Sequence, residues 1–317
     1  MGAVGGYYGL KLVQSGENVH FYLRTNFGDV KRHGFTLIHC GDEEKTDQFD
    51  SLSIYQDSTE IGICDWVIIA AKAIANDQIC ELVKPMVNSK TSFLTLQNGM
   101  GNVENIASAF GANRTILAGL CFTCINRTDP TTIESILPGY VQFGQFGGKI
   151  DTKAEDLICC FEHAGIKLKR TESLDEALWR KLCWNVPFNG LSIAAGGITT
   201  DIILNTPNLR TIARKLMLEI QAGAKAHRIE IEDSFLNKQF SLTQPMGPYK
   251  PSSLIDFLSQ KAVEVDAIWG EPLRRAEKMG VQMPELKKLH SQLLRLTYKA
   301  FSIRASVRPS FLLSLTV

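Results

Sequence analysis

The sequence predicts an α/β protein: a Rossmann-like doubly wound sheet without its first strand, followed by an all-helical C-terminal domain. Three observations predict this fold: a glycine-rich opening, alternating strands and helices in the first half, and helical periodicity alone after residue 173. The 317 residues suffice for two domains, each with its own core. We expect a Rossmann-type domain over 1–170, a helical domain over 171–301 and an unassigned tail over 302–317.

The opening of the chain is typical of the end of a G-x-G-x-x-G motif, with Gly2 as its second glycine and Gly5 as its third. In such motifs the second glycine lets the backbone approach a pyrophosphate, and the third lets the helix pack on the sheet. The first glycine and its strand are absent, which predicts a gap of roughly 10 Å, two strand spacings, in the sheet. Either the natural start lies upstream, or the chain binds its nucleotide poorly; a flexible glycine-rich terminus is the alternative.

A helix over 3–15 and a strand over 19–24 follow this opening. Gly16 is suited to end the helix, and the strand alternates apolar and polar residues. Arg24 lies at the carboxyl end of the strand, where NAD enzymes place an acid for the ribose 2′-hydroxyl and NADP enzymes place an arginine for the 2′-phosphate. Arg24 therefore favours NADP, with an ordinary surface cation as the alternative.

Polar residues follow two consecutive predicted strands. Residues 65–72 form a nearly continuous apolar run that ends at Lys72, and residues 92–96 lead into a tight loop that contains Asn98. Ligands of such sheets bind at the carboxyl ends of the strands. Lys72 and Asn98 are therefore candidate site residues, although Asn-Gly is also a common turn pair.

The rest of the chain divides into a β-rich part and a helical part. Residues 116–169 are predicted to form short strands and turns, with a helix over 151–164 and a last strand over 166–170. Residues 241–251, rich in proline, are predicted to be a loop or lid. Helical periodicity elsewhere predicts helices over 77–85, 103–110, 174–195, 206–227, 252–280 and 284–301.

The helix predicted over 174–195 carries Lys181, Asn185 and Asn189 at a spacing of four residues. This spacing places one ammonium and two amides along the same helix face, about 6 Å apart per step. Their neighbours in sequence are large and apolar. These three residues are therefore either a site or a few solvated polar positions on a helix.

Composition excludes several classes of protein. The net charge of +1 gives no bulk electrostatic reason to expect nucleic acid or an anionic membrane as partner. No apolar run reaches the ~18 residues of a membrane span, and no leader opens the chain. The eight cysteines are expected to be reduced in a cytoplasmic protein, and the single C-x-x-C of Cys121 and Cys124 to be structural. We expect no metal site.

With these residues in view, the chain resembles the ketopantoate reductase family from Gly2 to about Thr297. The motifs that carry the resemblance are GAVGGYYG at the start, DWVIIAAK at 65–72, LQNGMG at 96–101, WRKL at 179–182 with the two asparagines that follow, KPSSL at 250–254, and EVD at 264–266. Their order and spacing together are far more specific than any single motif.

The resemblance implies an NADPH-dependent reduction of a 2-oxo acid to a 2-hydroxy acid, specifically ketopantoate to pantoate. It assigns catalytic roles to Lys181 and Glu264. It assigns substrate contacts to Asn98, Asn185, Asn189 and Ser253. It assigns cofactor contacts to Gly2, Ala3, Val4, Gly5, Arg24, Lys72 and Asn98.

The chemistry of hydride transfer requires these residue types independently. Negative charge builds on the ketone oxygen, and a lysine there can stabilise it and donate a proton. Amides and a hydroxyl can hold the substrate carboxylate, and an acid such as Glu264 can orient the substrate through its own hydroxyl. Ser253 could instead be a helix N-cap, and Glu264 a solvated helix residue.

Two alternatives remain open at this stage. One is a reductase of another branched 2-oxo acid, which the same site chemistry fits. The other is a non-catalytic, truncated relic of the fold that no longer holds NADPH, for which the missing strand is the chief argument. A small-molecule 2-oxo acid is the expected partner, and the sequence leaves a homodimer open.

Overall fold

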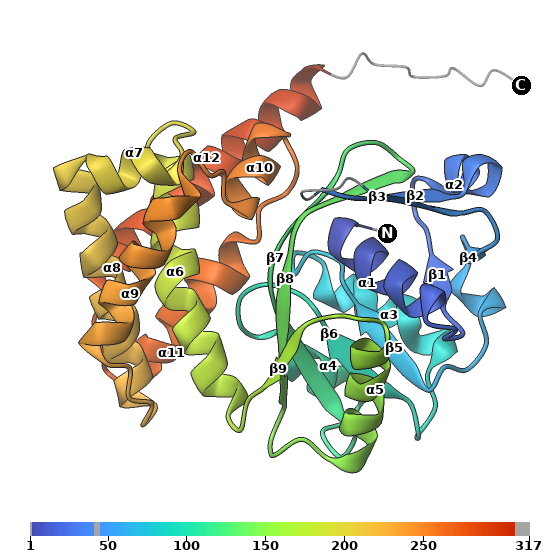
Figure 1. Ribbon diagram of the computed structural model, residues 1–317. Coiled ribbons are helices and arrows are strands. Elements are labelled where there is room, and N and C mark those ends of the chain that lie inside the picture. Colours follow the sequence, from blue (N-terminus) through green and yellow to red (C-terminus); the bar gives the residue numbers. More distant parts are fainter. Residues whose placement is uncertain (1, 41–44, 308–317) are drawn as a thin grey trace, which may run out of the picture. The chain divides into compact units, whose positions relative to one another are not determined.

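The computed structural model describes residues 2–40 and 45–307, and its internal contacts divide the chain into two compact units, Met1–Lys181 and Leu182–Val317. As the sequence predicts, the first unit is α/β and the described part of the second is helical (Figure 1). The domain boundary after residue 170 stays a prediction. Among the described helices, none combines the length and apolar character that a membrane crossing requires.

Two sheets form the frame of the first unit. The smaller sheet pairs two parallel strands, β1 (His20–Tyr22) and β4 (Ser53–Tyr55). The larger sheet has the strand order β3-β2-β8-β7-β6-β5, with β9 paired to β8. Its strands are β2 (Phe35–His39), β3 (Lys45–Phe49), β5 (Trp66–Ile69), β6 (Ser92–Thr95), β7 (Ile116–Arg127), β8 (Thr132–Gln145) and β9 (Leu168–Arg170).

The two strands that flank the predicted gap, β1 and β5, do not pair with each other within the described residues. In the doubly wound order 3-2-1-4-5-6, β4 and β1 stand for the third and second strands, and β5, β6 and β7 for the fourth to sixth. The sheet is therefore interrupted at the position where the sequence predicts that its first strand is missing.

Helices cover both faces of the larger sheet (Figure 1). α1 (Ala3–Gln14) contacts α5 (Thr152–His163), β7 and β8, whereas α4 (Asn102–Phe110) contacts β6, β7 and α3 (Asn76–Val83). Successive residues of β6 point to opposite faces, so both faces must exclude water. All four residues of β6 are accordingly buried. The short helix α2 (Phe27–His33) follows β1, and single 3₁₀ turns occupy Ser58–Glu60 and Lys84–Met86.

Two long strands, β7 and β8, replace the short strands predicted over 116–169. They pair antiparallel, with register shifts on both sides of Cys124. Gly139 on β8 has φ of 54°, and a Cβ at this position would overlap the carbonyl oxygen of Phe122 on β7. The prediction was wrong because a bulge and a glycine in the left-handed region interrupt the apolar pattern without ending the pairing.

The helices of the second unit follow the predicted periodicity in part. α6 (Leu174–Ala194) begins in the first unit and continues through Pro187. The helices predicted over 206–227 and 284–301 are present as α8 and α12. The described helices after α6 are α7 (Thr200–Asn205), α8 (Pro207–Ala226), α9 (Asp233–Thr243), the 3₁₀ turn η3 (Gln244–Met246), α10 (Ser252–Leu258), the π-helix η4 (Asp266–Gly270), α11 (Glu271–Lys278) and α12 (Pro284–Val307).

Two predictions in this unit require correction. The single helix over 252–280 is wrong, because an irregular segment and the π-helix η4 separate α10 from α11. The loop over 241–251 is wrong at its start, where α9 reaches Thr243 and a 3₁₀ turn covers Gln244–Met246. Of the unassigned tail, α12 includes 302–307, and 308–317 lie outside the described residues.

Candidate functional site

A chain of side-chain amides holds the loop after β6. The Thr95 hydroxyl donates to Gln97 Oε1 at 2.9 Å, and Gln97 Nε2 donates to Asn76 Oδ1 at 2.8 Å. Asn76 Nδ2 donates to Asn102 Oδ1 at 3.0 Å, and Asn102 Nδ2 donates to the backbone carbonyl of Asn98 at 3.1 Å. The network ties the starts of α3 and α4 to the loop, so it fixes the backbone from which Asn98 projects.

The sequence analysis did not identify this network. Asn76, Gln97 and Asn102 carry no motif of their own, and only their places at the starts of two helices and the end of a strand could have marked them. Two glycines of the loop, Gly99 and Gly101, have φ of 83° and 89°, which makes the tight turn that the sequence predicts.

Lys181 and Asn98 are brought together within the first unit. Lys181 Nζ donates to Asn98 Oδ1 at 3.1 Å, and the ammonium lies 5.2 Å from the centroid of the Phe122 ring. Lys181 belongs to α6 and is half-buried. The predicted catalytic cation therefore lies beside the carboxyl end of β6, with its position set by an amide and by an aromatic face.

Cys121 lies next to Phe122 on β7. Burial raises its pKa, and the charge of nearby Lys181 lowers it by less. A raised pKa favours the protonated form of a thiol at neutral pH. All eight cysteines of the chain are free.

The predicted cofactor residues lie at the start of α1 and at the ends of two strands. Gly2 is the N-cap of α1, and the first turn of this helix carries no acidic residue. A Cβ on Gly2 would lie 4.0 Å from the carbonyl oxygen of Ala70, just beyond β5. The free N–H groups of the first helical turn, which includes Ala3, Val4 and Gly5, are thus close to the strand end that Lys72 follows.

Arg24 is exposed two residues beyond β1, on the smaller sheet. No described contact links it to the start of α1. The structure therefore agrees with a surface cation as well as with a phosphate ligand at this position, and the cofactor role of Arg24 stays a prediction.

Two of the predicted substrate residues meet within the helical unit. Asn189 Oδ1 accepts a hydrogen bond from the backbone N–H of Ser253 at 3.0 Å, and both residues are at most 3% exposed. Pro251 is the N-cap of α10, and Ser253 is its second helical residue. The interpretation of Ser253 as the N-cap is therefore wrong, and its hydroxyl is not used to cap the helix.

Asn185 and Glu264 are also buried in this unit, at 9% and 8% exposure. The interpretation of Glu264 as a solvated residue is therefore wrong. Glu264 lies two residues before η4, where a π-helical turn brings the indole N–H of Trp269 to the carbonyl oxygen of Val186 on α6 at 2.9 Å. Gly190 allows this approach, because a Cβ there would lie 2.8 Å from the Trp269 indole nitrogen.

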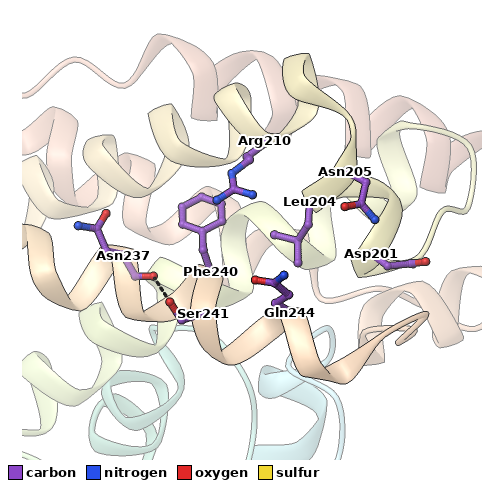
Figure 2. A pocket seen from close by; sticks show the side chains of 8 residues that line it. All are labelled: Asp201, Leu204, Asn205, Arg210, Asn237, Phe240, Ser241 and Gln244. Atoms are coloured by element: carbon purple, nitrogen blue, oxygen red, sulfur yellow. Dashed lines mark hydrogen bonds between the residues drawn. The ribbon is translucent and has the colours of Figure 1, made fainter.

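A cavity of about 290 Å³ opens elsewhere in the helical unit. Figure 2 shows the guanidinium of Arg210 over the Phe240 ring, 5.3 Å from its centroid. The lining is mixed in charge, and it includes none of the predicted site residues. Its lining residues are Asp201, Leu204, Asn205, Arg210, Asn237, Phe240, Ser241 and Gln244.

Comparisons with known proteins agree with the residue pattern. The family models "Ketopantoate reductase PanE/ApbA" and "Ketopantoate reductase PanE/ApbA C terminal" match residues 1–148 and 173–296. The chain is 34% identical to a 2-dehydropantoate 2-reductase of Nostoc sp. over 297 residues, which cover 92% of each chain.

Solved structures show the same fold. A 2-dehydropantoate 2-reductase of Geobacter metallireducens superposes with a TM-score of 0.87 at 35% identity, covering 95% of this chain and 97% of that chain. D-mandelate dehydrogenase, solved with NADH and anilino(oxo)acetate, has a TM-score of 0.86 at 22% identity over the same shares. The second likeness concerns the fold alone.

Proposed function

Because the chain belongs to the ketopantoate reductase family PanE/ApbA and is thus an oxidoreductase, we propose that it reduces ketopantoate to pantoate with NADPH. The observation that carries the proposal is the 3.1 Å hydrogen bond from Lys181 to Asn98. It supports a cationic acid at the carboxyl end of β6, the edge at which such sheets bind their ligands.

The start of α1 fits the pyrophosphate of a dinucleotide. No side chain of the described residues caps its first turn, the helix dipole favours an anion there, and Gly2 leaves room for close backbone approach. In this proposal Gly2, Ala3, Val4 and Gly5 hold the pyrophosphate, and Lys72 and Asn98 contact the rest of the cofactor. NADPH supplies the hydride when it is bound.

Lys181 acts on the carbonyl oxygen of the substrate. As the carbonyl carbon accepts hydride, the ammonium stabilises the negative charge on oxygen and then donates its proton, which completes the alcohol. Asn98 holds the ammonium through its amide oxygen, and an ammonium has three donor hydrogens in all.

The helical unit supplies the groups that orient the substrate. Asn185, Asn189 and the Ser253 hydroxyl hold its carboxylate, because they donate hydrogen bonds without adding a titrating group. Glu264 accepts a hydrogen bond from the substrate hydroxyl and so sets the angle of the carbonyl. All four residues are buried, so their polar groups are held in place by the packing of the helical unit.

We also propose a cytoplasmic location, which the eight free cysteines support because reducing compartments keep thiols unpaired. Reduction of another 2-oxo acid is the second candidate function. D-mandelate dehydrogenase, which has the same fold, was solved with NADH and anilino(oxo)acetate, so the fold by itself does not select ketopantoate. A homodimer stays a prediction.

Turnover of NADPH by the purified chain tests the function. We expect oxidation of NADPH with ketopantoate, and an NADPH-induced stabilisation of about 2.7 kcal/mol at a hundredfold excess over Kd. Stabilisation with turnover of a different branched 2-oxo acid would support the second candidate. Absence of both stabilisation and turnover would contradict either reductase and favour the non-catalytic relic.

Replacement of Arg24 by alanine tests the cofactor preference. Because an arginine pairs with the 2′-phosphate that only NADPH carries, we expect Arg24→Ala to raise the Kd for NADPH about tenfold and the Kd for NADH less than about twofold. Cofactor titrations by fluorescence measure both values. Arg32→Ala, which removes another exposed arginine of the first unit, is the control. An equal change for both cofactors would contradict the assignment.

A further inference from the structure

A row of four side chains crosses three strands of the larger sheet and ends at Lys181. The Lys181 ammonium lies 5.2 Å from the centroid of Phe122. Phe122 stacks on Tyr140 with a centroid distance of 4.6 Å and an interplanar angle of 14°. The Lys169 ammonium lies 4.1 Å from the centroid of Tyr140.

Strand register builds this row. Phe122 on β7 is paired directly with Tyr140 on β8, so their side chains share one sheet face. Lys169 on β9 is paired with Gln142, two residues beyond Tyr140 and therefore on the same face. Because β8 lies between β7 and β9, Tyr140 is supported by Phe122 on one side and by Lys169 on the other.

The bulge next to Phe122 fixes the part of the row that contacts Lys181. The register shift after Phe122 and the positive φ of Gly139 let the two strands approach closely at this point. Both rings are half-buried, which limits their rotation. Burial also raises the pKa of Tyr140, so this ring stays neutral beside Lys169.

We propose that Phe122, held by Tyr140 and Lys169, is a positioning residue for Lys181. The inference rests on the proposed function, in which Lys181 is the proton donor. Asn98 restrains the ammonium through one hydrogen bond, and the ring face restrains it from a second direction. The amide oxygen and the ring are neutral groups, and a ring face favours the charged form of an ammonium.

Substitution of Phe122 tests the proposal against a matched control. We expect Phe122→Leu to lower kcat about tenfold, with the KM for NADPH changed less than about twofold, and Phe122→Tyr to restore most of the rate. The control is Phe110→Leu. Phe110 stacks on Phe93 at 4.8 Å, so Phe110→Leu removes a stacked ring of the same unit. An equal loss of kcat in the control would overturn the proposal.

Fluorinated phenylalanines at position 122 distinguish an electrostatic effect of the ring face from an effect of the ring's shape. Each added fluorine weakens the negative potential of the ring and barely changes its size. We expect log kcat to fall steadily with the number of fluorines, and the alkaline limb of the pH profile to move to lower pH. A purely structural role predicts no trend, and a flat series would overturn the proposal.

Chemical labelling of Lys181 tests the contact with Phe122 without any enzymatic turnover, so its result does not depend on the proposed function. Brief acetylation with acetic anhydride, followed by mass spectrometry, reports the unprotonated fraction of Lys181 at each pH. We expect Phe122→Leu to shift half-maximal labelling of Lys181 to lower pH, and Phe110→Leu to leave it in place. If the wild-type chain reduces no 2-oxo acid but this shift occurs, the proposed function fails and the positioning contact stands. An unchanged labelling curve in Phe122→Leu contradicts the positioning contact itself.

Discussion

Lys181→Ala is expected to lower kcat by about 10²–10⁴-fold, the range for loss of a general acid that also stabilises charge in the transition state. Lys181 is hydrogen-bonded to Asn98, and of these two side chains only the ammonium is acidic enough to transfer a proton to the product oxygen. The substitution removes this group. Steady-state kinetics with NADPH and the best 2-oxo acid measure this loss. We expect the Kd for NADPH to change much less than kcat, because the proposed pyrophosphate contacts lie on α1.

Two variants make the Lys181 result specific. Lys84→Ala removes an exposed lysine of the same unit, ion-paired with Glu81 at 2.6 Å, and should leave kcat unchanged. Lys181→Arg keeps the positive charge, but its guanidinium does not release a proton and is too broad for the same place. It should therefore be nearly as slow as the alanine variant. Normal kcat in Lys181→Ala would remove this lysine from the mechanism.

Gly139→Ala is expected to cost about 3 kcal/mol or more in the free energy of unfolding of the first unit. The residue has φ of 54°, which disfavours any side chain, and its Cβ would also overlap the backbone carbonyl of Phe122. A backbone atom held in a sheet cannot move aside as a flexible side chain can. The strands must therefore separate at the bulge, which also displaces the ring that contacts Lys181.

Gly147→Ala is the matched control for this effect. Gly147 follows β8, has φ of 75°, and has no atom within 4 Å of a built Cβ. Gly147→Ala should lower the free energy of unfolding only through the unfavourable positive φ, by about 1 kcal/mol. Urea unfolding monitored by fluorescence measures both variants, and kinetics should show slower turnover for Gly139→Ala alone. If both substitutions lowered the free energy of unfolding equally, the overlap with the Phe122 carbonyl would add no cost, which would contradict the prediction.

Local patterns were sufficient for the elements that carry the predicted site. The apolar run before Lys72, the strand and loop around Asn98, and the helix that contains Lys181 are all present close to their predicted bounds. Each depends on neighbours within a few residues: strand alternation, a turn pair, or a helical period. The interruption of the sheet between β1 and β5 could be inferred for the same reason, since the opening glycines lack a preceding strand.

Errors arose where distant contacts override a local pattern. Residues 252–280 have helical periodicity throughout, yet η4 and the segment before it break the helix. At that break Trp269 bonds to Val186, which is 83 residues away. The bulge of β7 likewise depends on a glycine of β8, so no window around Cys124 reveals it.

Most helices and strands, and the polar side chains at their ends, could be predicted because they depend on interactions between near neighbours in the chain. Which of those side chains meet depends on the packing of distant segments. Lys181 reaches Asn98 across 83 residues, and the ring of Phe122 reaches Tyr140 through strand register. Such pairings are set by packing of the whole unit, and no local propensity encodes them.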